Sequence, residues 1–174
     1  MPETQVSEHG SENFEVLLEI FQLILASEGD PQTIYPFLQR NVGILDDSLA
    51  ERLTLWIKGI LQRTTPEEAQ SIGIAVLIFS NLIRAFPLGN RASNLETAIA
   101  GYYAATEVFD NQNFPKQWAV IQSNLGNAYL ERIRGDKSNN LELAIQYYQN
   151  ALSIYALNNY PSEWAKTMAL PTAW

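Results

Sequence analysis

The chain has 174 residues, is 47% hydrophobic and 17% charged, and carries a formal net charge of −8 with no cysteine. The apolar content is sufficient for a folded core, and the lack of cysteine excludes disulfides, thiolate metal sites and a cysteine nucleophile. Because polyanion binding depends on clustered Lys and Arg, the acidic balance argues against nucleic acid and anionic membrane surfaces as partners.

The N-terminal segment, residues 1–11, is polar and acidic, and we expect a disordered tail there. It has neither the basic start nor the apolar run of a secretory signal. The longest apolar run, Ile72 to Phe79, has eight residues, whereas a bilayer-spanning helix needs about 20. A cytoplasmic protein without a membrane partner is therefore expected.

Residues 12–74 predict a helical leader in front of a more regular region. Apolar residues at helical spacing indicate a first helix that ends near Gly29. Asp30-Pro31 predicts the start of the second helix, because the carboxylate accepts bonds from free amides and proline suits the first helical position. Asp46-Asp47 predicts the start of the third. The expected buried side of the third helix comprises Leu49, Leu53, Leu55, Trp56, Ile60 and Leu61.

A fourth helix is predicted from Thr65 to about Phe86. It begins with Thr65-Pro66-Glu67-Glu68, which has the spacing of a capping box with proline first, and Pro87 stops it. No Asn-Gly or Asp-Gly hairpin signal occurs between alternating runs. The fold is therefore expected to be all-α.

Residues 75–174 contain an internal repeat. Residues 93–119 and 139–165 agree at 11 of 27 positions without a gap, 46 residues apart. Ser93-x-x-Glu96 and Asn139-x-x-Glu142 have capping-box spacing, so each copy is expected to start a helix there. A repeated unit of two helices is typical of an α-solenoid of antiparallel helix pairs.

A fainter copy lies upstream. Ser80-Asn81-Leu82 matches Ser123-Asn124-Leu125, which predicts an offset of 43 residues there. The three missing residues are assigned to the loop, because loops tolerate such changes at small cost. In this alignment Ile83 stands where the later copy has Gly126.

Two patterns resemble the tetratricopeptide repeat (TPR). One is Leu125-Gly126-x-x-Tyr129, and the other is the spacing shared by Ala98, Tyr102, Ala105 and by Ala144, Tyr148, Ala151. Small residues let paired helices approach closely, and large ones fill the space between them. The periodic aromatic residues are therefore expected in the repeat core and not in a ligand cage; they are Tyr102, Tyr148, Trp118 and Trp164.

More narrowly, the phrases NLExAI, YPxxWA and NLGxAYLERIRGD resemble the long repeats of bacterial, especially cyanobacterial, multi-repeat proteins, which are similar to kinesin-light-chain-type repeats. In the resembled proteins such arrays often precede a caspase-like (CHAT) domain. The resemblance implies a right-handed superhelical stack and a non-catalytic interaction module or scaffold that binds a protein or peptide. The alternative is a regulatory fragment of a CHAT-type protease or signalling protein whose catalytic domain is absent from this chain.

No pattern in the chain suggests catalysis or a bound cofactor. A caspase-like centre needs a His–Cys pair, whereas the chain has no cysteine and one histidine, His9, in the expected tail. No His-x3-His, calcium-loop, G-x-G-x-x-G or P-loop pattern is present. We therefore expect no enzyme activity, no metal and no cofactor.

One stripe of the helix expected from residue 115 indicates a binding surface. Asn124, Asn127 and Glu131 recur at spacings of three and four, on a different face from the apolar positions. In the resembled family this face lines the concave groove, and asparagine both donates to and accepts from a peptide backbone. The 43-residue alignment places Asn81 with Asn124 and Arg84 with Asn127. The predicted partner-binding groove comprises Asn81, Arg84, Asn124, Asn127 and Glu131, and the alternative is a solvated polar face.

The last unit is expected to be truncated. Residues 164–169 begin another copy of residues 118–123, but Pro171 then falls where Leu125 was and interrupts the helix. The chain ends at Trp174 without a polar capping helix. An uncapped apolar face is expected to self-associate or to be closed by a partner.

Overall fold

The computed structural model describes residues 6–157 and 160–169, and in this part of the chain the fold is all-α, as expected. A short 3₁₀ turn, Val42–Ile44, separates the second and third helices. The helices are α1 (Val6–Ser27), α2 (Pro31–Arg40), α3 (Leu49–Leu61), α4 (Pro66–Ala85), α5 (Arg91–Thr106), α6 (Pro115–Glu131), α7 (Lys137–Leu157) and α8 (Pro161–Met168). Among these residues, none of the helices combines the length and the apolar character that crossing a bilayer requires.

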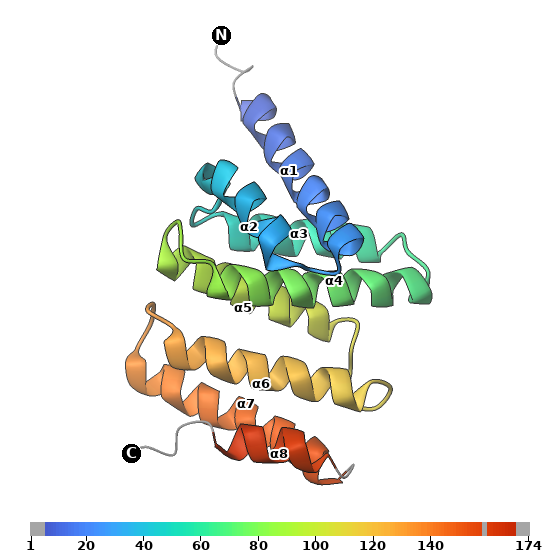
Figure 1. Ribbon diagram of the computed structural model, residues 1–174, viewed down its shortest axis with the longest axis vertical. Helices are drawn as coiled ribbons and strands as arrows, with labels where there is room; N and C mark the ends of the chain where they lie inside the picture. The colour runs from blue at the N-terminus through green and yellow to red at the C-terminus, as the bar shows by residue number, and fades with distance from the viewer. Residues whose placement is uncertain (1–5, 158–159, 170–174) are drawn as a thin grey trace.

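The helices follow one another along the long axis of the molecule, with α1 at one end and α8 at the other (Figure 1). α4 packs against α5 and α6 against α7, each pair joined by a short loop, and α5 also packs against α6. The leader joins this stack through α3, which packs against α5, and through α1, which contacts α2 and α4. One hydrophobic core therefore extends from α1 to α7.

Local hydrogen bonds set the starts of two leader helices, as the sequence predicts. The carboxylate of Asp30 caps α2 by accepting from the amides two and three residues further on, at 3.2 and 3.1 Å. Thr65 and Glu68 form both bonds of the predicted capping box at the start of α4. The expected tail is too long, because α1 already begins at Val6; residues 1–5 lie outside the described residues.

The buried side of α3 differs from the prediction. Leu49, Leu53 and Ile57 are four residues apart, so they form one buried stripe on the helix that packs against α5. Leu55 lies away from this stripe and is 60% exposed. The prediction that Leu55 is buried is wrong because it followed hydrophobicity and not the four-residue spacing.

The contacts of α4 and α5 recur in α6 and α7 at a constant offset of 46 residues. Gly89 and Gly135, in the loops that join each pair, both have φ of +80°, a conformation that favours glycine. The side-chain amide of Asn94 donates to the carbonyl of residue 88 at 2.8 Å, and that of Asn140 donates to the carbonyl of residue 134 at 2.9 Å. The two loops therefore have the same construction.

The predicted offset of 43 residues for α4 is wrong. α4 ends at Ala85 and α6 ends at Glu131, 46 residues later, so no residues are missing from the first loop. Ser80, and not Ile83, is consequently the counterpart of Gly126. The predicted alignment of α4 with α6 followed the shared phrase Ser-Asn-Leu. The structural counterparts are instead given by the loop contacts, which are 46 residues apart.

α5 and α7 begin earlier than predicted. The side chain of Asn90 accepts from the amide of Ser93 at 3.1 Å, and that of Asp136 accepts from the amide of Asn139 at 3.0 Å. The capping role predicted for Ser93 and Asn139 is therefore wrong, since their own amides are the groups that are capped. The Ser93 hydroxyl instead donates to Asp47 at 2.5 Å and connects α5 to the segment before α3.

Three of the four predicted core aromatics are at least half-buried. Tyr102 is fully buried, and Tyr148 and Trp118 are half-buried. Trp164 is 41% exposed on α8, so its assignment to the core is wrong. The reason is its position, because α8 is the last helix that the structure describes and it packs against α7. The expected interruption at Pro171 lies outside the described residues.

Each unit also repeats an aromatic pair near the end of its second helix and the start of the next one. The rings of Phe109 and Phe114 meet edge to face with centroids 5.4 Å apart, and those of Tyr155 and Tyr160 do so at 6.4 Å. Phe114 and Tyr160 immediately precede the prolines that begin α6 and α8. The 46-residue step therefore extends from one end of the unit to the other.

Candidate functional site

A polar cluster lies where α4, α5, α6 and α7 meet, and it contains most of the predicted groove residues. Arg84 and Glu131 both act electrostatically on Tyr102 and on Tyr148, so charges and hydroxyls from all four helices lie close together. We refer to this set as the interhelix polar cluster. Its members are Asn81, Arg84, Arg91, Tyr102, Asn127, Glu131 and Tyr148.

Two asparagine–tyrosine hydrogen bonds repeat within the cluster, 46 residues apart. The hydroxyl of Tyr102 donates to Oδ1 of Asn81 at 2.8 Å, and the hydroxyl of Tyr148 donates to Oδ1 of Asn127 at 3.0 Å. Each bond occupies the amide oxygen and leaves the NH2 group to donate elsewhere. Within the described part of the chain, neither NH2 group has a protein partner.

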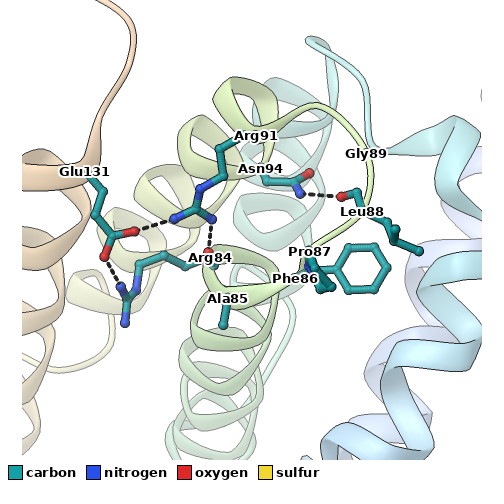
Figure 2. Close-up of a pocket in the computed structure, with 9 residues that line it drawn as sticks. All are labelled: Arg84, Ala85, Phe86, Pro87, Leu88, Gly89, Arg91, Asn94 and Glu131. Atoms are coloured by element: carbon teal, nitrogen blue, oxygen red, sulfur yellow. Dashed lines mark hydrogen bonds and ion pairs between the residues drawn. The ribbon is translucent and has the colours of Figure 1, made fainter.

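Glu131 joins α6 to the end of α4 through an ion-pair network, which Figure 2 shows. One of its carboxylate oxygens accepts from Arg84 at 2.5 Å, and the other accepts from Arg91. Arg91 also donates to the backbone carbonyl of Arg84. Two guanidinium groups thus share one carboxylate, so a positive charge remains uncompensated within the network.

A pocket of about 220 Å³ lies beside this network, at the loop between α4 and α5 (Figure 2). Asn94 is buried and shapes the pocket through its bond to the carbonyl of Leu88. The volume is below the range of about 300–1,000 Å³ that is usual for small-molecule sites. It suits a terminal group of a larger ligand, such as a carboxylate, which guanidinium groups bind well.

Burial raises the pKa of both tyrosines that hold the asparagines, Tyr102 and Tyr148, to about 12. The charge of Arg84 lowers the pKa of each, but the loss of solvation is the larger cause. Both phenols are therefore protonated at neutral pH and donate to the asparagine oxygens. The orientation of the two amides is accordingly independent of pH near neutrality.

The free energy of unfolding is expected to fall as the pH rises from 10 to 12. The folded pKa of Tyr102 is about 12 against an ordinary value of 10.0, so its stabilising contribution is complete below pH 10 and is lost toward pH 12. One such tyrosine gives a slope of about 1.4 kcal/mol per pH unit. Urea unfolding across this range compares the native protein with Tyr102→Phe, which is expected to have the shallower slope. Parallel slopes would contradict this prediction.

Four of the five predicted groove residues belong to the interhelix polar cluster. The fifth, Asn124, is half-buried and makes no side-chain hydrogen bond with the described residues. The constant offset makes Asn127 the counterpart of Asn81, so the predicted pairing of Asn81 with Asn124 is wrong. The pairing of Arg84 with Asn127 is wrong for the same reason.

Three members of the cluster were not predicted from the sequence as site residues. Tyr102 and Tyr148 were predicted as core residues alone, and no pattern indicated Arg91. A signal for the tyrosines exists, because in both units a tyrosine follows the asparagine by 21 residues. Arg91 gives no comparable signal, since it reaches Glu131 across 40 residues of sequence.

Comparison of the chain with protein-family models, with curated proteins and with solved structures finds no match. In the part of the chain that the structure describes, no three His, Cys, Asp or Glu side chains gather as a metal site requires. The site is therefore defined by its geometry: free amide donors on α4 and α6, beside two arginines that share one carboxylate.

Proposed function

We propose that the chain is a non-catalytic interaction module that binds an extended segment of a protein partner across α4 and α6. The observation that carries the proposal is the repeated asparagine–tyrosine bond, which leaves the NH2 groups of Asn81 and Asn127 to donate to a ligand. The backbone carbonyls of an extended peptide are suitable acceptors, and each is an obligatory hydrogen-bonding group.

The spacing of the helices supports a peptide that crosses the stack. Packed helices lie about 8–10 Å apart, which corresponds to about three residues of extended chain at about 3.3 Å each. One extended peptide of a few residues is therefore long enough to reach asparagines on both α4 and α6. Arg84 and Arg91, which share Glu131, add a positive charge that favours an acidic residue or a chain terminus of the partner.

The architecture proposed with this function is a TPR-like solenoid of antiparallel helix pairs in a right-handed stack. It is supported by the 46-residue recurrence of the loop glycines, the helix starts and the aromatic pairs. The order of the helices along the long axis is also that of a stack (Figure 1). In this proposal the protein is a cytoplasmic scaffold that needs no cofactor.

Selection from a library of displayed random peptides tests the proposed function. The affinities of enriched peptides are measured for the native chain and for the double variant Asn81→Ala/Asn127→Ala. Removal of two hydrogen bonds is expected to weaken binding by about tenfold or more. The matched control is Gln146→Ala/Gln149→Ala, which removes two exposed amides from α7 and is expected to bind as the native chain does.

Circular dichroism checks that both double variants keep the native helix content. A library that yields no binding peptide contradicts the proposed function. Enriched peptides that bind the Asn81→Ala/Asn127→Ala variant with native affinity contradict the assignment of the binding face to α4 and α6.

A further inference from the structure

A second and larger cavity lies between α3 and α5, on residues other than those of the interhelix polar cluster. It has a volume of about 780 Å³, and the end of α6 contributes to its wall. Ile57 on α3 and Ile99 and Ala104 on α5 are buried and form its apolar lining. The volume lies within the range of about 300–1,000 Å³ that is usual for small-molecule sites. We refer to it as the α3–α5 cleft.

Small side chains on α5 keep the cleft open. Ala100 and Ala104 are four residues apart, so they lie on the same face of the helix, and both line the cleft. Their counterparts 46 residues later are Gln146 and Asn150, which are larger and polar. The small side chains that line the cleft are therefore not repeated at the counterpart positions of α7.

Three tyrosine hydroxyls meet at the wall of the cleft. The hydroxyl of Tyr103 lies 2.8 Å from that of Tyr129 and 2.5 Å from that of Tyr147. Tyr103 and Tyr129 line the cleft, and the rings of Tyr129 and Tyr147 stack with centroids 5.4 Å apart. Three hydroxyls carry three protons and the two bonds use two of them, so one O–H remains. Either atom can be the donor in each bond, so this O–H faces the cleft when it belongs to Tyr103 or Tyr129.

The hydroxyls of Tyr103 and Tyr147 are neutral at physiological pH. Burial raises the pKa of Tyr103 far above its ordinary value, and the bonds to Tyr129 and Tyr147 raise it further. Burial also raises the pKa of Tyr147. The spare proton is therefore held by the three tyrosine hydroxyls and is available for a hydrogen bond.

The charges around the cleft balance one another. Arg132 donates to both carboxylate oxygens of Glu96, each at 2.8 Å, so this pair is satisfied internally. The two other charged residues of the lining are Lys58 and Glu107, which have opposite signs. No net charge attracts an ion into the cleft, and its apolar lining favours a neutral ligand.

We propose that the α3–α5 cleft binds a small, uncharged, planar aromatic compound that carries one hydrogen-bond acceptor. The ring of the compound packs against Ile57 and Ile99 and against the rings of Tyr103 and Tyr129. Offset or edge-to-face contact between aromatic rings strengthens such packing. The acceptor takes the spare phenolic proton, which fixes the ligand at one end of the cleft.

Nile red is a suitable probe because it is uncharged, planar and aromatic, carries a ring carbonyl, and fluoresces strongly in apolar sites. Fluorescence titration compares the native chain with Ala100→Trp, which fills the cleft from its wall. The control Gln146→Trp places the same side chain on the exposed counterpart position of α7. We expect saturable binding to the native chain and the control, and at least tenfold weaker binding to Ala100→Trp. No saturable binding, or equal affinity for all three, would overturn the proposal.

A second variant tests the hydroxyls without changing the shape of the cleft. Tyr103→Phe/Tyr129→Phe keeps both rings and removes both hydroxyls that line it. Loss of one hydrogen bond is expected to weaken Nile red binding about fivefold, whereas pyrene, which has no acceptor, is expected to bind unchanged. If the affinities for both probes fall equally, or if neither affinity falls, the ligand's acceptor does not bind the hydroxyls of Tyr103 and Tyr129, and this part of the proposal is wrong. Ala100→Trp and this double variant are each checked for native helix content.

Discussion

Replacing Phe109 by alanine is expected to lower the free energy of unfolding by about 3–5 kcal/mol. Phe109 is 1% exposed although it lies in the loop between α5 and α6. Its ring packs against Phe114, and a Cβ atom added to Gly73 on α4 would lie 2.7 Å from its Cε2 atom. One loop side chain therefore holds α4 and the start of α6 together, and its removal leaves a cavity that rigid helices surround.

Urea unfolding followed by circular dichroism measures the loss. The matched control is Leu55→Ala, because Leu55 is large and apolar but 60% exposed. This control is expected to change the free energy of unfolding by no more than about 0.5 kcal/mol. A loss below about 1 kcal/mol for Phe109→Ala would show that the loop does not belong to the core.

Replacing Gly126 by leucine is expected to lower the free energy of unfolding by about 3 kcal/mol. Gly126 lies on α6 where α7 approaches, and a Cβ atom there would be 2.6 Å from Cδ1 and 2.9 Å from Cζ of Tyr148. Any larger side chain must displace the tyrosine ring. Because Tyr148 donates to Asn127, the displacement is also expected to free the amide of Asn127 and to weaken peptide binding.

The matched control for this change is Gly59→Leu on α3. No atom lies within 4 Å of a Cβ added to Gly59, and the position is exposed. Leucine is favoured over glycine in a helix by about 0.5–1 kcal/mol, so the control is expected to be neutral or stabilising. Denaturant unfolding measures the free energy of unfolding of Gly126→Leu and of Gly59→Leu. Equal effects at the two glycines would contradict the close approach of α6 and α7.

The features that the sequence predicted well depend on neighbours in the chain. Asp30 and Thr65 cap their helices through residues no more than three positions away. The all-α fold was predicted from patterns that lie within single helices, namely apolar spacing in the leader and the spacing of small and aromatic residues in the repeat. The capping roles of Ser93 and Asn139 failed because better acceptors, Asn90 and Asp136, stand three residues earlier.

The features that could not be predicted from the sequence depend on contacts between distant segments. The two arginines of the ion-pair network reach Glu131 across 47 and 40 residues, and no local pattern marks them as partners. Phe109 lies in a loop, so no helical spacing of apolar residues predicts its burial. The predicted offset between α4 and α6 was wrong because it followed the shared phrase Ser-Asn-Leu. The shared backbone conformation of Gly89 and Gly135, which gives the correct offset, is visible only in the structure.

The constant 46-residue step also gives the chain a natural unit of length. Duplication of any 46 consecutive residues within α4 to α7 places a new asparagine, its tyrosine and its loop glycine in register, wherever the duplicated segment begins. An insertion of another length between an asparagine and its tyrosine would change the 21-residue separation of that pair. Such a chain can grow or shorten through recombination without a preferred breakpoint, and each added unit would extend the proposed binding face by one oriented amide.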